Sequence, residues 1–297
     1  MFIEIKKMMK KQLIVKKVMS DKEIEDKEGT FFNDDGIKIF DKDVDIYKED
    51  GSLLLKFRKN VITKEQCQKL TVFEKVVGSS RRLSASGIPI KSQKSQYKLV
   101  KSKKTGKLYK SIPNVKKINS GIIGFYDNSS NFHSSREKDK NNKQVKCRQT
   151  AFTAQNFDKF KNCLGVFKKI DRIYKKLVPK YYKIQKDAID TIDPEFVIKD
   201  TIFTTVTVNR NFRTALHRDY GDFKQGFGNL VIVSEGDYEG GYTMFPQYGV
   251  GVNCRGGDFI AMDVHEWHCN SEIKGDGKRF SFVFYLREKM LKSCPNE

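Results

Sequence analysis

Histidine and tryptophan are scarce in this chain of 297 residues, which has four histidines and a single tryptophan. Two of the histidines, His265 and His268, lie three residues apart in the stretch GGDFIAMDVHEWHCN, which also holds the tryptophan. Histidine is the commonest metal ligand and the side chain that most readily exchanges a proton near neutral pH. So few histidines leave few places for chemistry of either kind, and most of them lie in the last third of the chain.

Cysteine is also sparse, and no two cysteines form a Cys-x-x-Cys pair. The six are Cys67, Cys147, Cys163, Cys254, Cys269 and Cys294. Cysteines this far apart, in a medium-sized chain without a secretion signal, are typical of reduced thiols. The N-terminal MFIEIKKMMKKQLIVKK has lysines in every apolar run, which argues against a signal peptide and a membrane span. We therefore expect an intracellular protein that makes no membrane contact and is not secreted.

Acidic residues are few relative to basic ones: 37 Asp and Glu face 57 Lys and Arg, for a formal net charge of +20. An excess of this size favours a polyanionic partner, because each lysine or arginine that meets a phosphate releases condensed counterions. The chain as a whole is also rich in Lys, Asn and Ile, which a biased genome can produce without any binding surface. The charge favours nucleic acid and leaves the second explanation open.

The positive charge is concentrated in two stretches. Residues 91–117 hold ten lysines and no acidic residue, and residues 159–186 hold ten basic residues and one acid, Asp171. In the second stretch apolar residues recur at helical spacing, at Phe160, Leu164, Phe167, Ile170, Ile173 and Leu177. This pattern predicts a helix with an apolar seam and a basic face. A solvated surface helix explains the pattern equally well.

The first 118 residues show little regular pattern, and we expect a basic N-terminal extension with loops, partly packed on the core. Residues 1–50 suggest an irregular extension with a few strands, and residues 60–78 a short amphipathic helix. Residues 79–117 are rich in Ser and Lys, which predicts a long, mobile, basic loop. A second polar loop is expected over residues 128–146.

Residues 119–297 are expected to form one domain with two parts. Helices should cover about 155–190. From about 196 to 290 the chain consists of β-branched and aromatic runs separated by Gly, Asn and Asp. Many short strands at such spacing indicate an antiparallel sandwich or barrel. The fold class is therefore α+β, mainly β, with helices and basic loops packed on a β core.

The stretch FRTALHRDYGD places Asp219 two residues after His217. On a strand these two side chains share a face, so an imidazole and a carboxylate point into the same space. A distant histidine would complete a triad of two histidines and one carboxylate, which suits non-haem Fe(II). His-x-Asp alone is a common tripeptide. It gains specificity from a later strand that begins with Gly-Asp and ends in histidine, followed by Arg-x-Ser on the next strand.

Residues 203–290 resemble the double-stranded β-helix, a jelly-roll or cupin-like barrel, of the dioxygenases that use Fe(II), 2-oxoglutarate and O2. In that superfamily the ligand histidine follows the strand's Gly-Asp at a spacing that, counted from Gly257, falls on His268. The resemblance thus implies His217, Asp219 and His268 as the metal ligands and catalytic triad. It leaves His265 in the loop, as a residue on the substrate side of the pocket.

The resemblance also implies that Arg279 and Ser281 hold the distal carboxylate of 2-oxoglutarate. A guanidinium matches a carboxylate with two parallel hydrogen bonds, and a hydroxyl adds a third. Strand alternation puts Arg279, Ser281 and Val283 on one face and three phenylalanines on the other, so we expect the arginine to point into the barrel.

Upstream of the His-x-Asp, alternate residues share a face: Asn209, Asn211, Arg213, His217 and Asp219. Arg213 could reach the keto-acid end of the cosubstrate or a phosphate of the substrate, and the pattern does not choose between them. Asn211 is a candidate substrate contact.

Within the superfamily, the segments NRNFRTALHRDYGD, GGYTMFPQYGV, GDFIAMDVHEWHCN and RFSFVFYLREKM are similar to the TET/JBP branch. That branch oxidises the 5-methyl group of cytosine or thymine in DNA, on a base flipped out of the duplex. The resemblance puts Asp222 at the polar edge of the flipped base, where a carboxylate can accept from cytosine N4 or thymine N3. The substrate base therefore stays open.

The chain departs from the animal TET proteins, which have a cysteine-rich zinc-binding region, because none of its Cys/His clusters has the spacing of a zinc site. Contact with DNA would have to come from the basic loops and helix of residues 79–186. The oligomeric state is open, with a monomer the simpler expectation.

Three alternatives remain. An AlkB-type nucleic-acid demethylase usually has a second arginine at the position of Tyr285. A protein hydroxylase of the prolyl or lysyl type often replaces the anchoring arginine with lysine, and Lys278 has the wrong strand parity for that. A non-enzymatic jelly roll would need neither a complete triad nor the Arg-x-Ser pair.

Overall fold

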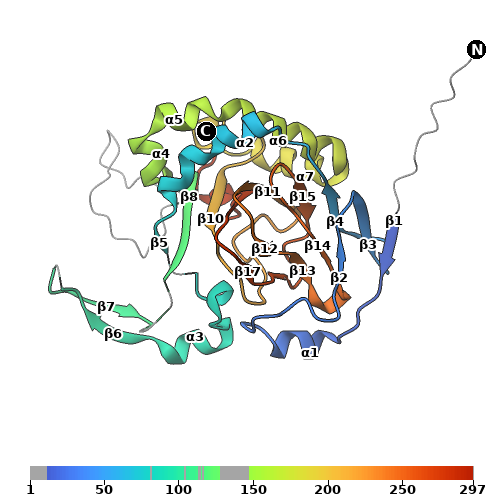
Figure 1. The fold of residues 1–297 in the computed structure, drawn as a ribbon. Coiled ribbons are helices and arrows are strands. Elements are labelled where there is room, and N and C mark those ends of the chain that lie inside the picture. Colours follow the sequence, from blue (N-terminus) through green and yellow to red (C-terminus); the bar gives the residue numbers. More distant parts are fainter. Residues whose placement is uncertain are drawn as a thin grey trace, which may run out of the picture.

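The computed structural model describes residues 12–80, 82–103, 105–112, 115, 117–127 and 147–296. Its centre is a jelly roll of two facing sheets, with helices stacked on the outer side of the larger sheet (Figure 1). The expected polar loop at 128–146 lies outside the described residues.

The larger sheet has ten strands and forms one wall of the core. Its order is β1 (Gln12–Val15), β3 (Val44–Lys48), β4 (Leu53–Arg58), β15 (Phe259–Met262), β11 (Gly228–Glu235), β18 (Lys278–Tyr285), β10 (Thr205–Arg210), β8 (Ile118–Asp127) and β5 (Ser79–Ser80), with β9 (Cys147–Gln149) paired to β8 off this path.

The smaller sheet forms the facing wall, in the order β16 (Cys269–Asn270), β13 (Thr243–Phe245), β14 (Val250–Val252) and β2 (Lys38–Phe40). Buried side chains from both sheets, such as Ile232 of β11 and Val252 of β14, belong to one apolar cluster between the sheets. Two short pairs complete the strands: β12 (Glu239–Gly240) with β17 (Ile273–Lys274), and β6 (Lys98–Lys101) with β7 (Leu108–Ser111).

Strand β18 shows why the core is built this way. Its phenylalanines, Phe280, Phe282 and Phe284, are buried in the cluster that the helices cover. The alternate residues face the inside of the barrel, as the period of two requires. The alternation expected from the sequence is therefore present, and it turns Arg279 and Ser281 inward.

The helices expected over about 155–190 are present as α4 (Ala151–Gln155), α5 (Phe157–Asn162), α6 (Leu164–Leu177) and α7 (Pro179–Ile189). The apolar seam of the basic stretch is split between α5 and α6, which meet at Cys163, so it does not belong to one helix. Phe167 and Ile170 of α6 are fully buried against the sheet, while Lys175 and Lys176 are exposed. A short helix, α8 (Met290–Ser293), ends the described chain.

The N-terminal third is more regular than its sequence suggests. Strands β1, β3 and β4 extend the large sheet, where β4 pairs with β15, and β2 pairs with β14 of the small sheet. Helix α1 (Asp21–Asp26) lies between β1 and β2. The expected helix at 60–78 is α2 (Lys64–Leu70) continued by a 3-10 helix at Thr71–Val76. The strands escape notice because charges interrupt them, and one of these charges, Arg58, is buried in an ion pair with Asp45.

A long, mobile, basic loop was predicted over residues 79–117, but the described residues of this range form regular elements. They form β5, a 3-10 turn at Ser84–Ser86, helix α3 (Ile90–Gln96) and the β6–β7 hairpin. The many Ser and Lys residues suggested a loop because they are polar. The backbones of β6 and β7 nevertheless pair as a hairpin, with Val100 opposite Tyr109.

The expectation of six reduced cysteines is also wrong. Cys147 at the start of β9 and Cys294 after α8 form a disulfide, with their Cα atoms 6.0 Å apart. The pairing joins distant parts of the chain, which spacing alone could not indicate. The other four cysteines are free thiols. In the described part of the chain, no helix combines the length and apolarity that a membrane span requires.

Candidate active site

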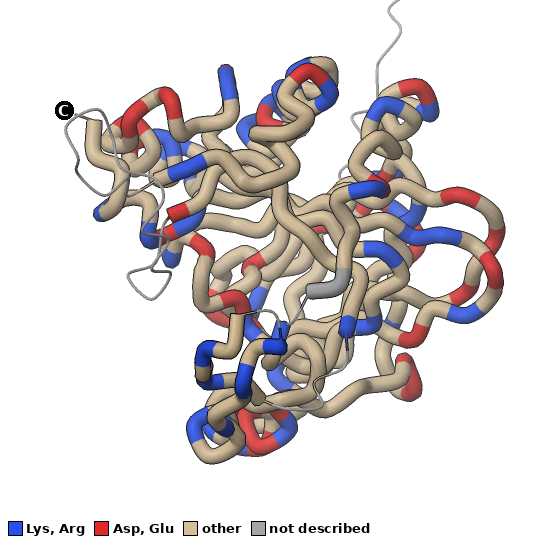
Figure 2. Tube along the Cα trace, turned by 90° about the vertical axis from the view of Figure 1, so that its left-hand side faces the viewer, with Lys and Arg blue, Asp and Glu red and all other residues tan. Residues whose placement is uncertain are grey.

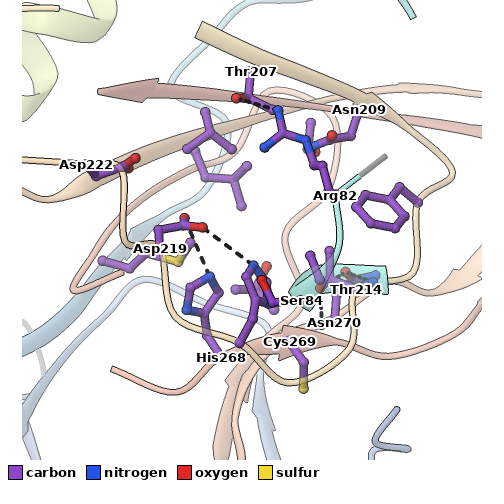
Figure 3. A pocket seen from close by; sticks show the side chains of 18 of the residues that line it. Arg82, Ser84, Thr207, Asn209, Thr214, Asp219, Asp222, His268, Cys269 and Asn270 are labelled. Carbon is purple, nitrogen blue, oxygen red and sulfur yellow. Dashed lines mark hydrogen bonds and ion pairs between the residues drawn. The ribbon is translucent and has the colours of Figure 1, made fainter. Parts of the chain in front are cut away.

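A cavity of about 290 Å³ opens inside the jelly roll, between β10, β18 and the loops that follow β10 and β15. His217, Asp219 and His268 line it, as do Arg279 and Ser281 of β18. Figure 3 shows Asp219 and His268 next to each other in this cavity. The sequence places these residues in separate motifs, and the fold brings them to one space.

The three candidate metal ligands face one another. Nε2 of His217 lies 3.6 Å from Oδ1 of Asp219, and Nε2 of His268 lies 3.8 Å from Oδ2 of the same carboxylate. One ligand atom from each residue lies within 4.8 Å of the others. Both imidazoles are buried, whereas the Asp219 side chain is 32% exposed toward the cavity. Two histidines and a carboxylate in this arrangement leave one side open, which is the donor set of non-haem iron.

The orientation of both rings is fixed by the backbone. Nδ1 of His217 lies 2.8 Å from the Ala215 carbonyl, and Nδ1 of His268 lies 2.9 Å from the Glu266 carbonyl. A carbonyl only accepts, so each Nδ1 carries the proton and donates it. Each Nε2 is therefore the ring nitrogen that faces Asp219 and is left for a metal, as in metal-binding histidines. Burial, together with the nearby His268, lowers the pKa of His217 to about 4, which keeps this imidazole neutral.

Hydrogen bonds between the two ligand-bearing segments hold the site together. His217 and His268 exchange backbone hydrogen bonds, each 3.0 Å long. One step along, the Asn270 amide oxygen accepts from the backbone and hydroxyl of Thr214, and the Asn270 backbone donates back to that hydroxyl. The triad is thus set by two paired segments rather than by a single loop.

Arg279 is a buried cation, 5% exposed, whose Nε has no hydrogen-bond partner. In the described part of the chain, no carboxylate lies within ion-pair distance of it. Its backbone amide donates to Oδ1 of Asn211 at 2.6 Å, and burial lowers the pKa of its guanidinium. The Ser281 hydroxyl, one step along the same face, accepts from the Asn209 amide at 3.2 Å. A buried guanidinium of this kind calls for an anionic ligand.

Iron and 2-oxoglutarate fit these residues. The triad supplies the donor set that Fe(II) takes, with the lone pairs already turned inward. At the other end, Arg279 is a buried positive charge without a negative partner among the described residues, which a cosubstrate carboxylate would satisfy. Both features line one cavity, so a small dianion could contact both.

Asp222 also lines the cavity, and its Oδ2 is buried without a partner. Burial raises its pKa well above the usual range, and the Asp219 carboxylate raises it further, against the positive charges of Arg82 and Arg287. Its backbone bridges to Arg287, which fixes the segment to the end of β18. A carboxyl group with an unused oxygen thus faces the space beyond the triad.

Arg82 is a pocket residue that the sequence did not reveal. It comes from the segment expected to be a loop, and lies across the cavity from Asp219 and His268 (Figure 3). Its Nε donates to the Ser120 hydroxyl at 2.7 Å and its Nη2 to the Thr207 hydroxyl at 3.1 Å. Only the pairing of β8 with β10 brings these hydroxyls side by side, so no local pattern could have pointed to Arg82.

Three predicted contacts lie elsewhere. The Arg213 guanidinium donates to the Phe32 carbonyl and the Asn33 amide oxygen, so it faces the N-terminal segment and not the cavity. Asn211 supports Arg279 from behind, as described, and donates to the Gly277 carbonyl. The His265 ring lies 3.1 Å from the Phe223 carbonyl, outside the cavity lining. A left-handed backbone at Asn211 breaks the strand alternation on which the prediction for Arg213 relied.

A jelly-roll core with this triad and a buried arginine defines the 2-oxoglutarate- and Fe(II)-dependent oxygenase class. Within that class the chain belongs to the Tet_JBP family, the oxygenase domain of the 2OGFeDO superfamily, whose model matches residues 132–288. The family expected from the sequence is therefore confirmed.

Curated relatives include two proteins named bifunctional helicase and thymine dioxygenase JBP2. That of Trypanosoma brucei brucei is 35% identical over 188 residues, covering 62% of this chain and 16% of the relative. That of Leishmania braziliensis is 33% identical over 176 residues, covering 58% and 15%. Thymine dioxygenase JBP1 of Trypanosoma brucei brucei is 33% identical over 175 residues, covering 57% and 19%. The chain thus spans less than a fifth of the length of these relatives.

Among solved structures, NgTET1 in complex with 5mC DNA is similar, with a TM-score of 0.54 and 17% identity over 85% of this chain and 79% of that one. At this identity the likeness concerns the fold, and it confirms the jelly-roll architecture.

Proposed function

We propose that the protein is an Fe(II)- and 2-oxoglutarate-dependent dioxygenase that hydroxylates the 5-methyl group of a pyrimidine base in DNA. The observation that carries this proposal is the shared cavity. A complete triad and a buried arginine without a carboxylate partner among the described residues line it, and so does Asp222, which has one buried oxygen without a partner. Membership of the family and the names of the curated relatives give the reaction class. Thymine is the first base to test, because those relatives are named thymine dioxygenases.

His217, Asp219 and His268 would hold the iron through two Nε2 atoms and a carboxylate oxygen, and Arg279 with Ser281 would hold the distal carboxylate of 2-oxoglutarate. When bound, iron and cosubstrate supply the oxidising power: O2 is consumed, 2-oxoglutarate becomes succinate and CO2, and a methyl group becomes hydroxymethyl. The chain's own part is to orient both imidazoles through backbone carbonyls and to surround the reacting atoms with largely buried residues.

Asp222 would hold the polar edge of the base. Burial raises the pKa of this carboxyl group. In its protonated form it would both donate and accept a hydrogen bond. An ionised carboxylate would accept from thymine N3–H or cytosine N4. Either form positions the ring so that its 5-methyl group, and not its glycosidic side, faces the triad.

A buried triad requires the base to leave the duplex, at a cost of a few kcal/mol in stacking and pairing. Favourable contacts with the DNA backbone would offset this cost of extruding the base. The chain carries a net charge of +20, with lysines concentrated in residues 91–117, which follow Arg82, and in α6. We therefore propose DNA as the partner of this basic surface, and a place in the cell where DNA is found.

The proposal is tested by succinate release with three duplexes of one sequence: one with thymine, one with uracil in its place, and one with 5-methylcytosine in a uracil background. We expect a methylated duplex to raise succinate release several-fold above the uracil duplex, and the base that does so is the substrate. Equal rates with all three duplexes would contradict the proposal, because turnover would then not depend on a methyl group.

A further inference from the structure

One part of the molecule stands apart from the jelly roll. Helix α3 and the β6–β7 hairpin, residues 90–111, form a projection that we call the arm (Figure 1). Its two strands pair with each other and, in the described part of the chain, with no other strand. An isolated two-stranded hairpin is marginally stable in water by itself. Because β6 and β7 join neither of the two sheets of the jelly roll, the arm has surface that those sheets do not cover.

One end of the arm follows residues that line the cavity, and the other leads to a strand that is hydrogen-bonded to a lining residue, Arg82. On one side, Ser84 and Ala85 line the cavity, and the chain passes from them to α3 within a few residues. On the other side, β7 leads to β8, whose Ser120 accepts the hydrogen bond from Arg82. The arm is thus placed beside the mouth of the candidate active site.

The charge of the arm has one sign. Residues 91–117 contain no acidic residue, and Lys98, Lys101 and Lys110 are exposed. Among the arm's described lysines only Lys91 forms an ion pair, with Glu25. Figure 2 turns this side of the molecule toward the viewer and shows basic segments on its lower part, with acidic segments among them.

One face of the hairpin combines these lysines with exposed leucines. The register pairs Leu99 with Lys110 and Lys101 with Leu108, so these four side chains alternate on a single face. Leu99 is 67% exposed and Leu108 is 64% exposed, among the largest exposures of any apolar residue described here. Apolar side chains gathered on an uncovered surface mark an interaction site.

We propose that the arm grips duplex DNA beside the extruded base, with its lysines on phosphates and with Leu99 and Leu108 pressed into a groove as a wedge. This inference rests on the proposed function and adds the means of opening the duplex. A two-stranded ribbon fits a DNA groove, and apolar side chains inserted at a base step unstack it and bend the duplex. Positive charge without acids matches the phosphate backbone on either side of such a wedge.

The two basic stretches of the sequence, residues 91–117 and 159–186, have different roles in this proposal. Helix α6 lies at the top of the molecule in Figure 1, whereas the arm lies at the bottom. Of the two, the arm is the one whose neighbouring residues in the chain, Arg82 to Ala85, line the cavity. The arm, and not α6, is the surface that holds the substrate duplex next to the site.

The test uses Asp219→Ala as background, so that binding is measured without turnover, and a duplex with 2-aminopurine next to the target thymine. In that background, Lys101→Ala/Lys110→Ala should weaken binding several-fold and lower the slope of log affinity against log salt by about 2, since each phosphate contact contributes about 0.9. Leu99→Ser/Leu108→Ser should keep the salt slope but lose most of the rise in 2-aminopurine fluorescence. The matched control, Lys175→Ala/Lys176→Ala on α6, removes the same charge and should change neither quantity.

The inference is overturned if the arm variants bind and unstack the duplex as the background does, or if the α6 variant loses as much as the lysine variant. Its failure can be told from that of the proposed function. A wild-type protein that oxidises DNA while the arm variants behave normally refutes the arm alone. Unstacking that depends on the arm, without oxidation by the wild-type protein, refutes the proposed function alone.

Discussion

His217 and His268 hydrogen-bond to each other through their backbones, each amide donating to the other's carbonyl at 3.0 Å. Their rings lie with centroids 4.4 Å apart, and both Nε2 atoms face Asp219. The loop after β10 and the segment before β16 are thereby joined at the point where the ligands stand. The positions of the two imidazoles thus depend on each other, and a change in either segment should displace both metal ligands.

The first prediction concerns removal of the metal site. Asp219→Ala should lower Fe(II) affinity by more than the 10- to 100-fold that loss of an outer-shell partner costs, because it deletes a ligand. Isothermal titration with Fe(II) under anaerobic conditions measures the affinity. Asn270→Ala is the comparison: it breaks the hydrogen bonds to Thr214 without removing a ligand, and should cost no more than that 10- to 100-fold. Equal loss in both variants would contradict the assignment of Asp219.

The second prediction concerns the cosubstrate. Arg279→Ala should raise the KM for 2-oxoglutarate by about 10- to 100-fold, as expected for a charge-assisted hydrogen bond of about 1.5–3 kcal/mol. The neighbouring Lys278 cannot replace it, because its ammonium pairs with Glu74 and Glu235. Ser281→Ala should raise KM only several-fold. Steady-state kinetics at varied 2-oxoglutarate separates the two, and an unchanged KM in Arg279→Ala would refute the proposed anchor.

The third prediction uses a glycine that touches this arginine. Gly241 has φ +66°, and a Cβ added there would lie 2.9 Å from Cδ of Arg279. Gly241→Ala should therefore displace the guanidinium and raise the KM for 2-oxoglutarate. Gly36, with φ +74° and nothing within 4 Å of an added Cβ, is the matched control. Gly36→Ala should lose about 1–2 kcal/mol of stability from backbone strain and keep its KM. If KM rose equally in both, strain and not contact would be the cause.

The fourth prediction concerns Asp222, whose pKa is raised by burial. A carboxyl group with a raised folded pKa binds its proton more tightly when folded, so stability falls as pH rises from 3.8, the unfolded value, through the folded pKa. Asp222→Asn lacks that loss and should be more stable than wild type at neutral pH but not at pH 3. Urea unfolding at both pH values measures this. A variant less stable than wild type at neutral pH would contradict the raised pKa.

The sequence predicted the parts of the site that local patterns carry. Arg279 and Ser281 alternate with the phenylalanines of β18, so they share a face of that strand. His217 and Asp219 are only two residues apart, which keeps them close together, although the structure places them in the segment after β10 and not on a strand. Short β-branched runs separated by glycines predicted an antiparallel sandwich or barrel, and the family resemblance implied the jelly roll. These features depend on neighbours in the chain, which is why the sequence was sufficient.

Other parts depend on contacts between distant segments. Arg82 enters the cavity because two hydroxyls from paired strands hold it, and Arg213 leaves it because the segment before β2 supplies acceptors. The disulfide between Cys147 and Cys294 joins two ends of the described fold. None of these contacts has a signature in spacing or composition, so they could be found only in the structure.

The most direct test of the central claim is mass spectrometry of nucleosides from DNA incubated with the protein, Fe(II), 2-oxoglutarate and O2. The proposed function predicts a pyrimidine nucleoside heavier by one oxygen, formed by the wild-type protein and absent with Asp219→Ala under the same conditions. Unmodified nucleosides from wild-type protein that demonstrably binds iron and releases succinate would contradict it, and would show that the site acts on something other than a methyl group in DNA.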